Sequence, residues 1–124
     1  MPAVKLNHVD LQVSNVDAAR EFFETHFGLH STYQRAGQLA LLKDDAGLEL
    51  GVSNLRGLPP PAYPADFHVG FVLDRADEVR NIYERLRDGG VRIKMDLREG
   101  GPNLFFMCEG PDGIPIEIRA PRDS

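Results

Sequence analysis

The sequence contains no tryptophan and only one cysteine, Cys108, among its 124 residues. A single cysteine cannot form a disulfide within the chain, which fits a protein of the reducing cytoplasm. No apolar run approaches the roughly 20 residues that a membrane-spanning helix requires. The first five residues contain no apolar core of a signal peptide. Together these absences predict a cytoplasmic protein that does not depend on disulfides.

Positive charge is also scarce, with 14 Lys and Arg against 19 Asp and Glu, for a net charge of −5. This balance argues against a nucleic-acid role that rests on a basic face, and against binding to an anionic membrane. The hydrophobic fraction of 42% and the charged fraction of 27% are those of a globular protein. The length suits one ordinary domain, or two half-sized modules that share a core.

The two halves of the chain resemble each other at one constant offset. Residues 7–13 lead into a helical pattern that includes residues 17–24, and residues 67–73 lead into a similar pattern that includes residues 77–84. The matched pairs are His8 with His68, Val9 with Val69, Asp17 with Asp77, Arg20 with Arg80, and Glu24 with Glu84. The pattern indicates a duplicated module.

Each half predicts the order β-α-β-β-β. In the first half, alternation predicts strands near residues 6–13, 31–34, 38–43 and 48–53, and Gly28 is expected to end a helix that Ser14, Asn15 and Asp17 begin. In the second half, strands are expected near residues 67–73, 91–97, 103–107 and 114–119, and the helix is expected to begin with Asp74 and Asp77 and to end at Gly89. The fold class is therefore α+β.

The expected modules cover residues 4–53 and 66–120, within a single domain of residues 1–124. Residues 54–65 between them contain four prolines, which exclude a helix and favour an extended, fairly stiff connector. A helix covers only one face of each sheet. Two such sheets placed edge to edge would form a curved mixed sheet around a trough.

Four ionisable residues are expected on the uncovered faces. The aliphatic residues of each strand should lie under the helix, which places His8, Glu49, His68 and Glu117 opposite. Two imidazoles and two carboxylates suit a divalent ion of Zn, Ni, Fe, Co or Mn, and their combined charge of −2 would balance it. An octahedral ion would keep about two positions for water or substrate oxygens.

Several polar residues share these faces. Asp10 and Gln12 lie on the side of His8, where they would line the pocket or support a ligand. Arg119 follows Glu117 by two residues, which makes it the preferred contact for a substrate carboxylate. In contrast, His26 and His30 flank a helix end and are expected to be surface residues. Cys108 has no neighbouring base in sequence and is expected to be a buried small side chain.

The chain resembles the vicinal oxygen chelate superfamily, which includes glyoxalase I, fosfomycin- and bleomycin-resistance proteins, methylmalonyl-CoA epimerase and extradiol dioxygenases. The resemblance covers residues 4–120, and its motifs are strong together for the superfamily and weak for the substrate. These motifs are Leu6-Asn7-His8-Val9, Gly47-Leu48-Glu49-Leu50, Phe67-His68-Val69-Gly70-Phe71 and Gly110-Pro111-Asp112-Gly113-Ile114-Pro115-Ile116-Glu117.

The resemblance implies paired modules, a metal in the trough and bidentate chelation of substrate oxygens. Small members are usually homodimers with sites between chains, so that His8 and Glu49 of one subunit would join His68 and Glu117 of its partner. The His, Glu, His, Glu set is most similar to that of glyoxalase I. However, Gln12 and Ser53 stand where glyoxalase I has an arginine and an asparagine that hold glutathione. Another anionic substrate would have Arg119, Arg98, Arg35 and Asn103 available.

Three functions follow from this resemblance. The first is a metal-dependent lyase or isomerase that acts on a small oxygen-bearing metabolite, stabilises an enediolate-like species and uses Glu117, or Glu49 by symmetry, as the base. The second is a non-catalytic protein that binds an antibiotic. The third is a small extradiol-type dioxygenase, which would require Fe(II) or Mn(II). The four intact ligand positions favour an enzyme.

Overall fold

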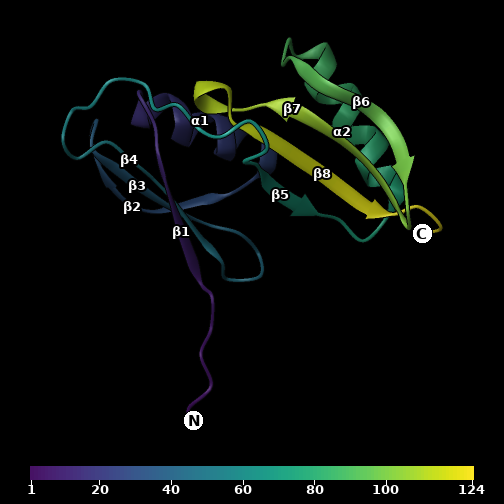
Figure 1. Cartoon of the computed structure of the whole chain (residues 1–124), viewed down its shortest axis with the longest axis horizontal. Helices are drawn as coiled ribbons and strands as arrows, with labels where there is room; N and C mark the ends of the chain where they lie inside the picture. Colours follow the sequence, from purple (N-terminus) through teal and green to yellow (C-terminus); the bar gives the residue numbers. More distant parts are fainter. The chain divides into compact units, whose positions relative to one another are not determined.

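A computed structural model describes residues 1–124, which fall into two compact units, Met1–Ala62 and Tyr63–Ser124. Each unit contains one helix and one four-stranded mixed sheet, so the expected α+β class and the order β-α-β-β-β are confirmed (Figure 1). The units are described separately below. No helix has both the length and the apolar character needed to cross a membrane.

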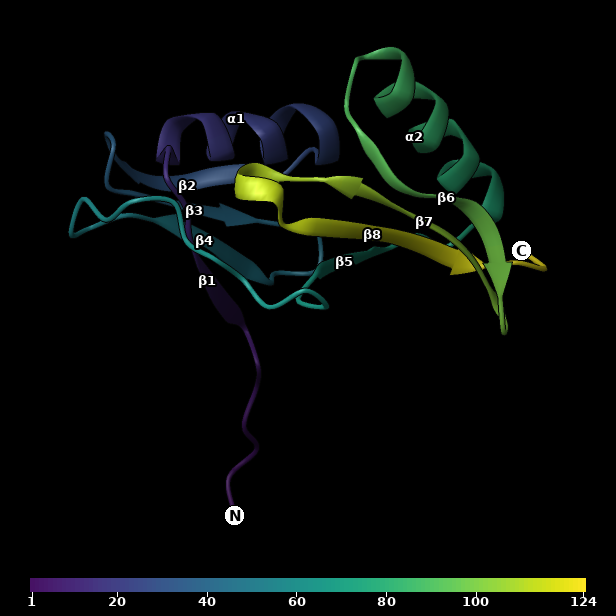
Figure 2. The ribbon, with the colours of Figure 1, turned by 45° about the horizontal axis from the view of Figure 1, so that its top comes forward.

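The first unit is built around the sheet order β1-β4-β3-β2, in which β1 and β4 are parallel and the other neighbours are antiparallel. Figure 2 shows α1 lying along one face of this sheet. The elements are β1 (His8–Gln12), α1 (Val16–Phe27), β2 (His30–Arg35), β3 (Leu39–Lys43) and β4 (Glu49–Ser53).

The second unit repeats this topology with the order β5-β8-β7-β6, in which β5 and β8 are parallel. Helix α2 contacts β6, β7 and β8. The elements are β5 (Val69–Val72), α2 (Ala76–Asp88), β6 (Ile93–Gly100), β7 (Asn103–Glu109), a short 3-10 turn η1 (Pro111–Gly113) and β8 (Pro115–Pro121).

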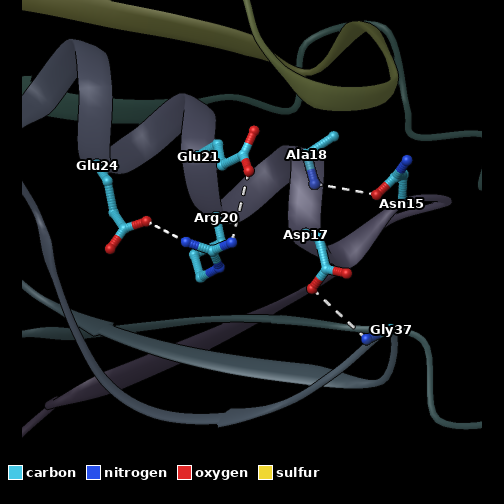
Figure 3. Close-up of polar contacts among 7 residues, drawn as sticks. All are labelled: Asn15, Asp17, Ala18, Arg20, Glu21, Glu24 and Gly37. Atoms are coloured by element: carbon cyan, nitrogen blue, oxygen red, sulfur yellow. Dashed lines mark hydrogen bonds and ion pairs between the residues drawn. The ribbon is translucent and has the colours of Figure 1, made fainter.

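The two helices begin differently. Asn15 caps α1, because its side chain accepts a hydrogen bond from the amide of Ala18 at 2.9 Å (Figure 3). Gly28 ends α1 in the left-handed conformation with φ of 67°, as expected. In α2 the expected start at Asp74 is wrong: Arg75 occupies the cap position and no side chain caps the helix. Asp77 instead lies in the first turn and pairs with Arg75.

Ion pairs anchor the exposed side of α1. The side chain of Arg20 donates to Glu24 at 2.5 Å and lies 3.6 Å from Glu21 (Figure 3). The amide of Gly37, in the turn before β3, donates weakly to Asp17 at 3.5 Å. The ion pairs of Arg20 lie within the helix, where an exposed pair contributes only about 0.2–1 kcal/mol. The hydrogen bond from Gly37 connects the helix to the turn between β2 and β3.

Both cores lie between helix and sheet. In the second unit the buried residues of β7 and β8 alternate along the strands, as the sequence predicted for β8, and burial of this area is the main stabilising contribution. Members of the two cores include Leu11, Val13, Phe23, Leu42 and Val52 in the first unit, and Val79, Leu86, Phe106, Ile116 and Ile118 in the second.

Three apolar residues do not follow the expected alternation. Val9 is 41% exposed although Leu11, on the same side of β1, is buried. Leu48 is 39% exposed and precedes β4 instead of lying under the helix. Phe67 precedes β5 and stacks on Tyr63 at 4.8 Å between ring centroids. β4 and β5 therefore begin one or two residues later than their apolar patterns predict.

The connector contains no helix, as its prolines required. Its first part is a turn and not an extended spacer: Asn54 accepts a hydrogen bond from the amide of Leu58 at 2.7 Å and donates to the carbonyl of Leu58 at 2.9 Å. The side chain of Asn54 thus stabilises a turn of residues 54–58 directly after β4.

Candidate metal-binding site

The open face of each sheet is defined here as the face that its helix does not cover. In the second unit this face brings together two of the predicted metal ligands. His68, immediately before β5, places Nε2 3.2 Å from Oε2 of Glu117 in β8. The His68 side chain is 43% exposed, whereas that of Glu117 is 16% exposed. The pair is accessible from solvent, and the residues of β8 on either side of Glu117 are buried.

The hydrogen bonding of His68 fixes which of its nitrogens can bind a cation. Its Nδ1 lies 3.0 Å from the backbone carbonyl oxygen of Asp66. A carbonyl oxygen only accepts, so Nδ1 carries a proton, and Nε2 is the ring nitrogen left for a cation. Nε2 faces the Glu117 carboxylate, so a cation bound there would contact both groups. Nδ1 bonded to an oxygen is also the usual arrangement of a metal-binding histidine.

The first unit contains a corresponding pair. His8 in β1 and Glu49 in β4 are direct register partners, so their side chains leave the parallel strands on one face. Nδ1 of His8 lies 2.9 Å from Oδ1 of Asn7, so Nε2 is again the ring nitrogen left for a cation. In both histidines an oxygen atom occupies Nδ1, as in most metal-binding histidines.

The two glutamates do not occupy equivalent positions, which corrects the expected symmetry between them. His8 pairs with Glu49, but in the second unit Gly70 pairs with Glu117. Glu117 therefore lies two residues further along its strand than Glu49. The backbone confirms the offset, because the amide of Val13 donates to Ser53 whereas the amide of Leu73 donates to Arg119.

A third carboxylate lies on the open face of the first unit. Ser53 donates a hydrogen bond to Oδ2 of Asp10 at 2.6 Å. The carboxylate crosses over Gly51, because a Cβ at that position would lie 2.5 Å from Oδ1 of Asp10. Ser53 is almost fully buried, and its hydroxyl proton is used in this contact.

The remaining predicted binding residues are more dispersed. Arg119 is exposed and follows Glu117 in β8 on the same face. Arg98 in β6 is exposed and pairs with Phe105, whereas Asn103 starts β7 opposite Gly100. On the first unit, Gln12 pairs with Ser53, and Arg35 ends β2 as an exposed residue. Of this set, Arg119 lies nearest in sequence and register to the His68–Glu117 pair.

Sequence reasoning missed two apolar residues of the open face. Phe105 and Met107 alternate in β7 with the buried Leu104 and Phe106, and both are partly exposed. Met107 is the register partner of Glu117, and the ring of Phe105 lies over Gly100. The alternation of residues 103–107 in the sequence is the signal that could have found them.

Comparison with known proteins identifies the family of this chain. The family model of the Glyoxalase/Bleomycin resistance protein/Dioxygenase superfamily matches residues 5–118. The chain belongs to this superfamily. The structure of a possible glyoxalase from Bacillus cereus is 32% identical, with a TM-score of 0.81 and coverage of 94% of this chain and 98% of that one.

Two further relatives represent different activities within the superfamily. A lactoylglutathione lyase structure from Agrobacterium tumefaciens has a TM-score of 0.80 at 18% identity, covering 97% of this chain and 96% of that one, which shows the shared fold. Biphenyl-2,3-diol 1,2-dioxygenase 2 of Rhodococcus globerulus is 24% identical over 121 residues, which is 93% of this chain. The chain spans 62% of the length of that enzyme.

The four predicted ligands fit a divalent cation in chemical type. Imidazole and carboxylate ligands suit the transition metals that were expected. The structure brings the predicted ligands together as two pairs, one in each unit, and contains no group of three or more His, Cys, Asp or Glu side chains placed to hold an ion. Each pair is called a half-site below.

Other titratable residues lie apart from these half-sites. His30 is exposed, with Nε2 3.8 Å from a carboxylate oxygen of Asp45, and His26 packs edge-on against Phe22. Cys108 is fully buried, as expected. Burial raises the pKa of its thiol from 9.0 to about 11, so the thiolate needed for nucleophilic chemistry is suppressed.

The raised pKa of Cys108 predicts a pH-dependent contribution to stability. Because the unfolded thiol ionises near pH 9 and the folded one near pH 11, the thiol's contribution is present below pH 9 and lost as the pH rises to 11. We expect the free energy of unfolding of wild type, relative to Cys108→Ala, to fall over this interval by on the order of 2 kcal/mol. Denaturant titrations at several pH values measure the difference. A constant difference would contradict the prediction.

Proposed function

We propose that this protein is a divalent-metal-dependent enzyme of glyoxalase type, a lyase or isomerase that acts on a small oxygen-bearing metabolite. The observation that supports it best is the His68–Glu117 pair. Nε2 of His68 lies 3.2 Å from the Glu117 carboxylate, while Nδ1 is occupied by a backbone carbonyl oxygen, an arrangement suited to a cation. His8, Glu49, His68 and Glu117 would hold the ion, which we propose to be Zn, Ni, Fe, Co or Mn.

The bound ion would supply Lewis-acid polarisation of a substrate carbonyl and stabilise enediolate-type charge. Glu117 would act as the base that takes a proton from the carbon beside that carbonyl, and Glu49 is the second carboxylate available for this role. Arg119, two residues from Glu117 on the same face, would hold an anionic group of the substrate. Met107 and Phe105 would provide the apolar wall beside Glu117.

We further propose that the protein acts as a cytoplasmic homodimer. In this arrangement, the His8–Glu49 half-site of one chain would join the His68–Glu117 half-site of another. The proposal accounts for two half-sites that each present only two predicted ligands. Sedimentation with and without metal tests it, and a monomer that binds metal with full affinity would contradict it.

Metal analysis and substrate screening test the function. Protein purified without chelators is expected to contain stoichiometric divalent metal. The loaded protein is expected to convert a hemithioacetal or a related α-hydroxycarbonyl compound, with loss of activity after chelation and recovery after metal addition. Metal-free protein that binds bleomycin tightly would overturn the proposal in favour of a binding protein.

A ring-cleaving dioxygenase is the second candidate, because the Rhodococcus relative at 24% identity is a dioxygenase. Its test is oxygen consumption with catechols by protein loaded with Fe(II) or Mn(II). Oxygen uptake without hemithioacetal conversion would favour this candidate over the lyase or isomerase.

A further inference from the structure

Three side chains form one row across the open face of the second unit. Phe105 of β7 is the register partner of Arg98 in β6 and of Arg119 in β8. Register partners in antiparallel strands project to the same face, and the neighbours of Phe105 in β7, Leu104 and Phe106, are buried on the other face. The two arginines therefore flank one aromatic ring, with their backbones about 9–10 Å apart. These three residues are called the arginine row below.

Neither arginine of the row is neutralised by the chain itself. Arg98 and Arg119 are exposed, and neither forms an ion pair or a side-chain hydrogen bond. Glu99, next to Arg98, instead accepts a hydrogen bond from Arg122 at 3.3 Å. Glu117, two residues before Arg119, faces the histidine of its half-site at 3.2 Å. Two guanidinium groups without partners favour an anion from solution, and a carboxylate matches the planar fork of a guanidinium.

Apolar side chains accompany the arginines on this face. A Cβ at Gly100 would lie 2.5 Å from Cε1 of Phe105, so the ring leans over the bare backbone of β6. Met107, the next open-face residue of β7, is partly exposed. Val72, the register partner of Arg119 in β5, is 65% exposed. A ligand held by the arginines would therefore also cover apolar surface.

The arginine row lies one step along the strands from the His68–Glu117 half-site. Glu117 precedes Arg119 by two residues in β8, which is a rise of about 7 Å. The two positive charges of the row and the one negative charge of Glu117 leave a net charge of +1 on this part of the face. That charge matches a single carboxylate.

We propose that the substrate is a carboxylate with an apolar segment. Arg98 and Arg119 together bind its carboxylate, the apolar segment rests on Phe105, and the reacting oxygens lie about 7 Å away at the His68–Glu117 half-site. This inference rests on the proposed function, because it names the substrate class of the same site. It assigns Arg98 to substrate binding beside Arg119, and it gives Gly100 the role of seating the ring between them.

Binding of model ligands to the metal-free protein tests the arginine row separately from the metal. Phenylbutyrate carries a ring, an alkyl chain and a carboxylate. Phenylbutanol lacks the charge, and acetate lacks the apolar segment. In calorimetric titrations with EDTA present, we expect phenylbutyrate to bind at least about tenfold more tightly than either of the others. Equal affinity for phenylbutyrate and phenylbutanol would overturn the inference.

Substitutions locate the binding site. Arg98→Ala and Arg119→Ala are each expected to raise the Kd for phenylbutyrate at least about tenfold and to leave that for phenylbutanol unchanged. Gly100→Ala keeps both guanidinium groups but displaces the Phe105 ring, so it is expected to weaken the binding of both compounds. Arg80→Ala is the matched control, because Arg80 is an exposed arginine of α2 without an ion pair. It should bind phenylbutyrate as wild type does.

Uptake of Co²⁺ by the same proteins separates this inference from the proposed function. If Arg98→Ala and Arg119→Ala bind phenylbutyrate as tightly as wild type while wild type takes up Co²⁺, the inference is overturned and the proposed function stands. If the variants behave as expected but wild type takes up no divalent metal, the proposed function fails, and the assignment of this carboxylate to a substrate fails with it.

Discussion

His68→Ala is expected to raise the Kd for divalent metal by about a hundredfold or more. Loss of a residue that only supports a ligand typically costs 10- to 100-fold in affinity, and loss of the ligand itself should cost at least the upper value. The variant removes the imidazole whose Nε2 lies 3.2 Å from Oε2 of Glu117. Titration with Co²⁺ and metal analysis after dialysis measure the effect.

His30→Ala is the matched control, because the His30 side chain is exposed and its Nε2 lies 3.8 Å from the surface carboxylate of Asp45. It should bind metal as wild type does. Circular dichroism should show that His68→Ala keeps the fold, since the side chain is 43% exposed and leaves no cavity. Equal affinity of the His68 variant and wild type would exclude a metal ligand at this position.

Phe106→Ala is expected to lower the free energy of unfolding by about 3–5 kcal/mol, the typical cost of removing a buried aromatic ring. Phe106 has no exposed surface, and its ring packs edge-on against Tyr83 of α2 at 5.2 Å between centroids. The change creates a cavity between α2 and β7 that the sheet cannot collapse to fill. Urea titration followed by circular dichroism measures the loss.

Phe105→Ala provides the comparison for that experiment, because Phe105 is the neighbouring ring on the open face and is only partly buried. Its loss of stability should be clearly smaller than that of Phe106→Ala. Equal losses would mean that the open face of the second unit is packed as tightly as the core.

Strand alternation made much of this fold predictable from sequence. Ile114, Ile116 and Ile118 were expected under a helix, and all three are buried. The same reasoning placed Glu117 opposite, where it meets His68. Alternation failed at strand ends, where Leu48 and Phe67 continue an apolar pattern beyond the last ladder pair. There the pattern is intact but the hydrogen bonding that defines a strand has stopped.

The register in which β1 pairs with β4, and β5 with β8, could not be predicted from the sequence. Alternation has a period of two, so it cannot distinguish Glu49 opposite His8 from Glu117 opposite Gly70. The contact between Asp10 and Ser53 was hidden for the same reason, because it depends on which residue of β4 lies beside Asp10. The absence of a Cβ at Gly51 has meaning only once that neighbour is known.

The different pairing of β1–β4 and β5–β8 has a consequence for how such duplicated sheets diversify. A register shift of one parallel strand by an even number of residues keeps its aliphatic side chains beneath the helix. A shift by an odd number would move all of them to the open face. The packing of the hydrophobic interior therefore does not select against a register shift by an even number of residues. A lineage with this architecture can relocate an acidic group from one strand to its neighbour without rebuilding the interior that supports it.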